Sequence, residues 1–93
     1  MGMVNKRNLK KYASQCFLCD VKEYSLLDVH RIIAGEHGGT YDLSNCLILC
    51  SNCHRSVHSK KIEIIKKHKS HGKTLFSVEV IIGGKKKFLP CHY

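Results

Sequence analysis

The sequence predicts a small α+β fold that is held together by a metal ion. Its 93 residues are enough for one small domain but too few to bury a large core, so an additional stabilising cross-link is expected. Two C-x2-C pairs supply one, since paired thiolates on tight turns are typical of zinc knuckles. Short strand-forming runs and one helix-sized segment, separated by glycines and polar residues, supply the α and β elements.

The chain is expected to begin with a basic arm over residues 1–14. This stretch is polar and weakly patterned, with Leu9 and Tyr12 as apolar anchors. We expect a flexible or partly helical segment that touches a phosphate backbone.

The segment 15–60 is expected to form the core, and its first regular element is a strand. Leu26 to Ile33 is rich in strand-forming residues, and a period of two places Asp28 and His30 on the same face. A glycine-rich loop then runs as far as Asn45. Because it is long for a simple hairpin, we expect this loop to carry function.

A second strand and a helix are expected to complete this core. Cys46 to Leu49 is an apolar run long enough for one strand. Ser51 or Asn52 can cap a helix that ends near Ser59. Two histidines four residues apart then share one helix face, a common way to offer two imidazoles to one metal: His54 and His58.

The remainder, residues 61–93, is expected to be a basic extension that ends in a β-hairpin. Thr74 to Ile82 is strand-like, Gly83-Gly84 is a two-residue turn, and Lys85 to Leu89 returns as a partner strand. For Ile62 to Ile65 periodicity leaves a strand and a helical continuation equally open.

The cysteine spacing predicts one structural zinc. Two knuckles from distant parts of the chain supply four thiolates, which is the ligand set of a closed tetrahedral site: Cys16, Cys19, Cys50 and Cys53. Such a site stabilises the fold and has no open position for chemistry. Two cysteines are left over: we expect Cys46 to be a small core residue and Cys91 to be a bystander.

The charge distribution suits either a polyanionic partner such as double-stranded DNA or a solvated, lysine-rich surface, and composition alone leaves these two interpretations even. The net charge is +9, and the basic residues gather in three clusters: Lys6, Arg7, Lys10 and Lys11; Lys60, Lys61, Lys66, Lys67, Lys69 and Lys73; and Lys85, Lys86 and Lys87. The chain has neither a long apolar run nor a secretory leader, so an intracellular, cytoplasmic location without membrane contact is expected.

A second, open metal site is expected near the glycine-rich loop. His54 and His58 alone could be exposed helix residues, but His30 and Asn45 flank the same loop. Together these four polar side chains can hold a cation beside a substrate.

The order and spacing of these residues resemble the HNH endonucleases. The resemblance covers about residues 14–60 and rests on Cys16-x2-Cys19, Val29-His30-x-Ile32, Gly38-Gly39, Ser44-Asn45 and Leu47-x-Leu49-Cys50-x2-Cys53-His54-x3-His58. It implies a ββα-metal core, in which two antiparallel strands and a helix surround one divalent cation that stabilises charge at the scissile phosphate.

The resemblance also implies roles for individual residues. The catalytic set would be His30, Asn45 and His54, with Asn45 orienting the base or helping to hold the metal. The cation, which could be Mg²⁺, Mn²⁺, Ni²⁺ or Zn²⁺, would be held by His30, His54, His58 and Asp28. His58 corresponds to the further histidine ligand of the colicin nucleases. Arg31 and Arg55 would contact phosphate.

One position departs from the family pattern. The family usually has a ligand followed by the base histidine between the flanking Val29 and Ile32, whereas this chain has His30 followed by Arg31. An arginine cannot accept a proton near neutral pH. The base is therefore His30 with Asp28 as ligand, or His37 or a metal-bound hydroxide with His30 as ligand, or cleavage is weak or lost.

Taken together, the sequence predicts an HNH-type endonuclease that cuts or nicks DNA by metal-dependent phosphodiester hydrolysis. The alternative is a zinc-dependent nucleic-acid-binding module in which Arg31 has replaced the general base.

Overall fold

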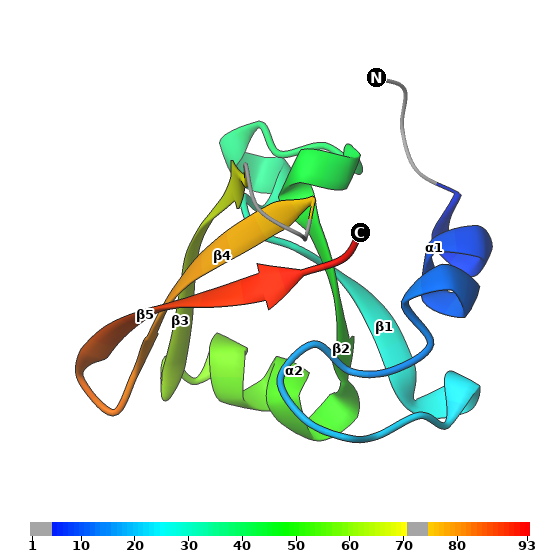
Figure 1. Cartoon of the computed structure of the whole chain (residues 1–93), viewed down its shortest axis with the longest axis horizontal. Helices are drawn as coiled ribbons and strands as arrows, with labels where there is room; N and C mark the ends of the chain where they lie inside the picture. The colour runs from blue at the N-terminus through cyan, green and yellow to red at the C-terminus, as the bar shows by residue number, and fades with distance from the viewer. Residues whose placement is uncertain (1–4, 71–74) are drawn as a thin grey trace.

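The computed structural model describes residues 5–70 and 75–93, which form a small α+β fold, as the sequence predicts (Figure 1). In chain order the helices and strands are α1 (Lys6–Ala13), β1 (Leu27–Arg31), β2 (Cys46–Cys50), α2 (Ser51–His58), β3 (Ile62–Lys69), β4 (Phe76–Ile82) and β5 (Lys85–Cys91). Short 3-10 turns lie at Tyr24–Leu26, Gly35–His37 and Leu43–Asn45.

β1 and β2 form a two-stranded antiparallel sheet, and α2 follows β2 directly. Leu27 pairs with Cys50 and Arg31 with Cys46. β1 is shorter than the predicted Leu26–Ile33 because the amide of Leu26 donates to the carbonyl of Glu23 and closes a 3-10 turn. Every residue of β2 is buried.

A three-stranded antiparallel sheet, in the order β3-β4-β5, covers β2 and α2 (Figure 1). The segment Ile62–Ile65, which periodicity left open, is the start of β3. β4 and β5 are joined at Gly83 and Gly84, whose φ angles of 60° and 77° suit glycine. Thr74, the first residue of the strand predicted over Thr74–Ile82, lies outside the described residues.

The hydrophobic core lies between β2 and the inner face of β4, and it draws on both ends of the chain. Alternate β4 residues are buried, as expected for a strand with one covered face: Phe76, Val78 and Val80. The edge of β2 that does not pair with β1 is also hydrogen-bonded. The carbonyl of Ile48 accepts a hydrogen bond from the amide of Phe17, and the amide of Ile48 donates one to the hydroxyl of Tyr93.

Lys67 corrects the predicted basic cluster of residues 60–73. A register shift between Ile64 and Lys66 in β3 turns the Lys67 side chain inward, where the residue is only 4% exposed. Its ammonium donates to the carbonyls of Leu43 and Cys46 at 2.8 and 3.0 Å. Lys67 therefore ties the second sheet to β2 and is not a surface cation. Lys73 of the same cluster lies outside the described residues.

The basic arm is helical over α1, with residues 1–4 outside the described part. Asn5 caps the helix by accepting a hydrogen bond from the amide of Asn8. Leu9 and Ala13 are buried, so one face of α1 packs on the domain beside β1 (Figure 1). Among residues 5–70 and 75–93, no helix is both long and apolar enough to span a membrane.

Candidate metal centres

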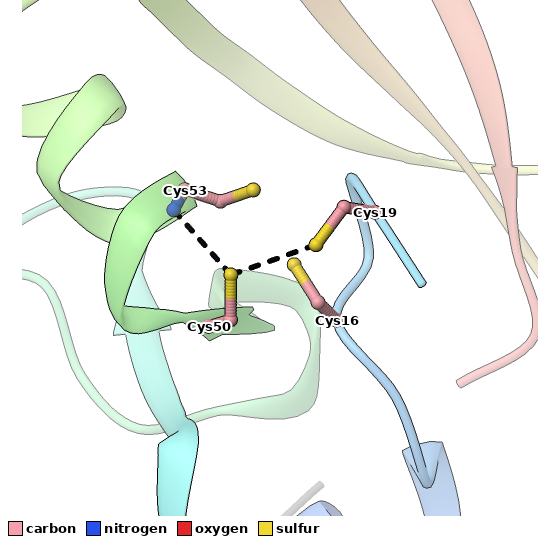
Figure 2. A group of neighbouring side chains, drawn as sticks. All are labelled: Cys16, Cys19, Cys50 and Cys53. Carbon is pink, nitrogen blue, oxygen red and sulfur yellow. Dashed lines mark hydrogen bonds between the residues drawn. The ribbon is translucent and has the colours of Figure 1, made fainter. Parts of the chain in front are cut away.

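Four cysteine sulfurs converge on one point between the first knuckle and the start of α2 (Figure 2). The Sγ atoms of Cys16, Cys19, Cys50 and Cys53 all lie within 4.8 Å of one another. Sγ of Cys19 lies 3.5 Å from Sγ of Cys50. The two halves of the cluster are brought together from opposite ends of the core segment, as the spacing predicts.

Backbone amides orient these thiols. The amide of Leu18 donates to Sγ of Cys16, and the amide of Cys53 donates to Sγ of Cys50, at 3.4 and 3.5 Å. Cys50 is also the N-cap of α2. Burial acts to raise the pKa of Cys50, but the hydrogen bonds from Cys53 and the neighbouring thiols together lower that pKa to about 7.

This donor set fits a tetrahedral zinc ion. Four thiolates around one centre, with amide hydrogen bonds to two of the sulfurs, are the chemistry of a closed structural site. The remaining cysteines lie elsewhere: Cys46 is fully buried in the core, and the thiol of Cys91 donates to the carbonyl of Tyr93.

Three histidines, one from β1 and two from α2, form a second cluster. One ring nitrogen each of His30, His54 and His58 lies within 4.8 Å of the others. The Nε2 atoms of His54 and His58 are 3.1 Å apart, and the His30 ring meets the His54 ring edge-on with centroids 5.2 Å apart. β1 therefore supplies one imidazole and α2 supplies two, from successive turns of one face.

Protonation is disfavoured at two of the three imidazoles, those of His30 and His54. Burial, and then the proximity of His54 and His58, lower the pKa of His30 to about 4. Burial and His58 also lower the pKa of His54, although Asp28 opposes this. Neutral imidazoles are the form that binds a metal ion, so the lowered pKa values of His30 and His54 favour metal binding near pH 7.

The histidine cluster opens onto a surface cleft of about 380 Å³. The cleft is lined by the three histidines together with Val29, Arg31, Ile32, Ala34 and Tyr41. The cysteine cluster has no part in this lining. Among the described residues, the thiolate cluster, in which Cys16 and Cys50 are buried, thus lies apart from the cleft onto which the imidazole cluster opens.

Comparison with known proteins identifies the family of the segment that carries both clusters. Residues 16–60, which carry both clusters, match the model of the family described as HNH endonuclease. Residues 16–60 of this chain are an HNH endonuclease domain.

Two known proteins are similar in sequence to parts of this chain. The type IV methyl-directed restriction enzyme EcoKMcrA of Escherichia coli (strain K12) is 46% identical over 35 residues, which are 38% of this chain and 13% of that enzyme. Anaredoxin of Nostoc sp. (strain PCC 7120 / SAG 25.82 / UTEX 2576) is 33% identical over 58 residues, which are 62% of this chain and 72% of that protein. No solved structure matches the chain significantly.

Of two further predicted HNH residues, Asp28 approaches a member of the cluster, whereas the Asn45 side chain bonds to the backbone of the loop. Oδ2 of Asp28 is 3.9 Å from Nδ1 of His54, the ring nitrogen opposite the one that approaches His58. The Asn45 side chain accepts a hydrogen bond from the amide of Ile33 and donates to the carbonyls of Ile33 and Thr40. Both arrangements suit positioning residues.

The other predicted residues divide between the cleft and open solvent. Arg31 lines the cleft, whereas His37 does not. The His37 side chain is 75% exposed and faces the adjacent Glu36 at 3.8 Å. Arg55 is exposed on α2.

Sequence reasoning missed Tyr41. This tyrosine comes from the glycine-rich loop and lines the cleft, where its ring is contacted by cations from two other elements. An aromatic residue inside a glycine-rich loop was a signal for it, but only the fold shows what the ring contacts.

Proposed function

We propose that this chain is a metal-dependent HNH endonuclease that cuts or nicks double-stranded DNA. The observation that carries the proposal is the convergence of three imidazoles on a surface cleft, within a domain of a nuclease family. The match to a restriction enzyme supports a nuclease or nucleic-acid-binding role, and DNA as the substrate is part of the proposal.

In this proposal β1, β2 and α2 are the ββα-metal core. His30, His54 and His58 hold one divalent cation, which could be Mg²⁺, Mn²⁺, Ni²⁺ or Zn²⁺. When bound, such a cation polarises the scissile phosphate and makes a nearby water a better nucleophile. Asp28 fixes the ring of His54, and Asn45 fixes the end of the strand that carries His30.

Arg31 occupies the place where the family usually has its base. Among the described residues that line the cleft, the basic nitrogens available near neutral pH belong to the three clustered imidazoles. We therefore assign Arg31 to the phosphate, which a guanidinium can bind through two hydrogen bonds, and place no proton transfer on it. His37 has no place in this arrangement because it lies outside the cleft.

The proposed enzyme also has a structural zinc, an intracellular location and a further phosphate contact. The four cysteines hold a structural zinc, which needs a reducing, intracellular environment to keep its thiolates free of disulfides. Arg55, exposed on α2, contributes a further phosphate contact.

A plasmid-nicking assay tests the proposal. Wild type should convert supercoiled DNA to the open-circular form when Mg²⁺, Mn²⁺, Ni²⁺ or Zn²⁺ is added, and His30→Ala or His58→Ala should reduce the rate about 100-fold or more. His37→Ala is the matched control, since it removes an exposed histidine outside the cleft, and its rate should equal that of wild type. Metal-independent nicking, or equal rates for all variants, would overturn the endonuclease proposal.

The second candidate is a nucleic-acid-binding module without catalysis, and Arg31 at the base position is the observation that favours it. In that case DNA binds with a steep dependence on salt, but no divalent cation produces nicking above the level of His30→Ala.

A further inference from the structure

Tyr41 brings together two cations from distant parts of the chain. Nζ of Lys6, at the start of α1, lies 4.1 Å from the centre of the Tyr41 ring. The guanidinium carbon of Arg31, at the end of β1, lies 4.3 Å from the same centre. Both distances are within the range of a cation–π interaction, so one ring orients both groups.

The guanidinium of Arg31 is also held from a second direction. A β-carbon placed on Gly35 would lie 2.8 Å from Nη1 of Arg31 and 3.1 Å from Nη2. The guanidinium therefore fills the space that the missing side chain of Gly35 leaves, next to Tyr41. Because its position is set by two neighbours, little conformational entropy remains to be lost when it binds a ligand.

Neither cation is neutralised within the described part of the chain. No carboxylate among residues 5–70 and 75–93 forms an ion pair with Lys6 or Arg31. The acid closest to Tyr41 in sequence, Asp42, accepts a hydrogen bond from the hydroxyl of Thr40. Two cations without an ion-pair partner that gather at one ring create a positive potential there, which favours an anion nearby.

The position of this group relative to the histidines suggests which anion it takes. Arg31 and Tyr41 line the same cleft as His30, His54 and His58. A polyanion with regularly spaced charges that reaches the histidines therefore also passes this group.

We propose that Lys6, Arg31 and Tyr41 form a subsite for the DNA phosphate next to the one that reaches the histidine cluster. Lys6 and Arg31 bind the phosphate oxygens, and Tyr41 is a positioning residue that holds the two cations at the cleft. The inference rests on the proposed function, since it takes DNA as the ligand. It makes α1, which lies outside the matched HNH segment, part of the substrate-binding surface.

The test is binding of a fluorescent DNA duplex to the zinc-loaded protein without any further divalent cation, so that no cleavage is needed. Lys6→Gln should weaken binding roughly fivefold and reduce the slope of log affinity against log salt by about one. Lys10→Gln is the matched control, because Lys10 is on the same helix and also contacts a tyrosine ring. Its Nζ lies 4.2 Å from the centre of the Tyr24 ring, and Tyr24, unlike Tyr41, does not line the cleft. Its effect should stay within about twofold.

Tyrosine and glycine variants separate the arrangement of charges from their number. Tyr41→Leu keeps both cations but removes the ring and should weaken binding roughly fivefold, whereas Tyr41→Phe, which keeps a ring, should bind like wild type. Gly35→Ala should weaken binding at unchanged net charge, because its methyl group displaces the guanidinium of Arg31. Zinc content and circular dichroism identify any variant that has lost its fold.

The outcomes are distinguishable from those of the nicking assay. Equal affinities and salt slopes for Lys6→Gln and Lys10→Gln, or wild-type binding by Tyr41→Leu, would overturn the subsite even if the protein nicks DNA. Conversely, the expected pattern in a protein that does not nick supports the subsite and overturns only the catalytic proposal.

Discussion

Asn45 spans the base of the loop that connects β1 to β2. Its side-chain oxygen accepts the amide of Ile33 at 2.8 Å, and its side-chain nitrogen donates to the carbonyls of Ile33 and Thr40 at 3.0 and 2.8 Å. Its own carbonyl accepts the amide of Ile32. One residue thus closes the loop and fixes the end of the strand that carries His30, which is how a side chain outside the histidine cluster can govern it.

Asn45→Ala should therefore destabilise the fold. The substitution removes three side-chain hydrogen bonds from a half-buried site, for which we expect a loss of about 1–3 kcal/mol. Urea denaturation in excess zinc measures it, and Asn52→Ala, at an exposed position on α2, should stay within about 0.5 kcal/mol. Equal losses for the two variants would show that the loop does not depend on Asn45.

Asp28 lies where it can act on the metal site through His54. Its carboxylate is 3.9 Å from Nδ1 of His54 and its side chain is 59% exposed. Carboxylates in this position orient the ring and raise its basicity, and removing one typically lowers metal affinity 10- to 100-fold.

Asp28→Asn should accordingly weaken Ni²⁺ or Mn²⁺ binding at the histidine cluster about tenfold, measured by calorimetry on zinc-loaded protein. Glu36→Gln, which changes an exposed acid facing His37, is the control and should bind like wild type. If Asp28→Asn abolishes binding as completely as His54→Ala does, Asp28 is itself a ligand, and its assignment as a positioning residue is wrong.

At the scale of the elements, β3 shows how a strand irregularity changes the role of a residue. The shift in pairing between Ile64 and Lys66 turns the Lys67 side chain toward β2, where its ammonium binds two carbonyls. Nζ of Lys67 also lies 4.4 Å from the centre of the Phe76 ring and 4.9 Å from the centre of the Tyr93 ring. Burial lowers the pKa of Lys67, and these contacts offset part of the cost of burying the charge.

Lys67→Met should destabilise the domain without changing its affinity for DNA. Methionine fills a similar volume but leaves the carbonyls of Leu43 and Cys46 without their donor, at an expected cost of about 1–3 kcal/mol. Lys69→Met, at an exposed position on the same strand, should show the opposite pattern: unchanged stability and a weaker dependence of DNA binding on salt. Denaturation curves and salt titrations of both variants decide between the two roles.

On the scale of the whole molecule, the thiolate cluster lies in the scaffold and the histidine cluster lies at the cleft. The thiolate cluster clamps the first knuckle to the start of α2, and the amide of Phe17 in that knuckle completes the edge of β2. A domain this small gains a large part of its stability from such a clamp. The histidine cluster instead opens onto the surface, where a cation bound as proposed could exchange with the solvent.

Removal of the structural zinc should unfold the protein. We expect one tightly held zinc per chain, and loss of the native circular dichroism when a chelator removes it, because metal binding and folding are coupled in such sites. Cys50→Ser should behave like the chelated protein. Cys46→Ala, which changes a buried cysteine outside the cluster, should keep its zinc and lose only about 1 kcal/mol of stability.

Two results would contradict the zinc assignment. A fold that survives complete removal of metal would show that the four thiolates are not needed as a clamp. Iron in place of zinc would replace the assigned ion while leaving the clamp intact, because four thiolates in a tetrahedral arrangement suit either metal.

The sequence by itself determined the small α+β class, the convergence of the four cysteines and the pairing of His54 with His58. These depend on local spacing: a C-x2-C turn brings two thiolates together, and residues four apart share a helix face whatever surrounds them.

Only the tertiary structure decided which distant side chains meet. It placed His30 with the two helix histidines, kept His37 outside the cleft, directed the amide of Asn45 to the backbone and buried Lys67. It also brought Lys6 and Arg31 to one tyrosine ring. These contacts depend on the register of β1 with β2, on the irregularity in β3 and on the packing of α1, none of which is encoded in the spacing of residues along a single element.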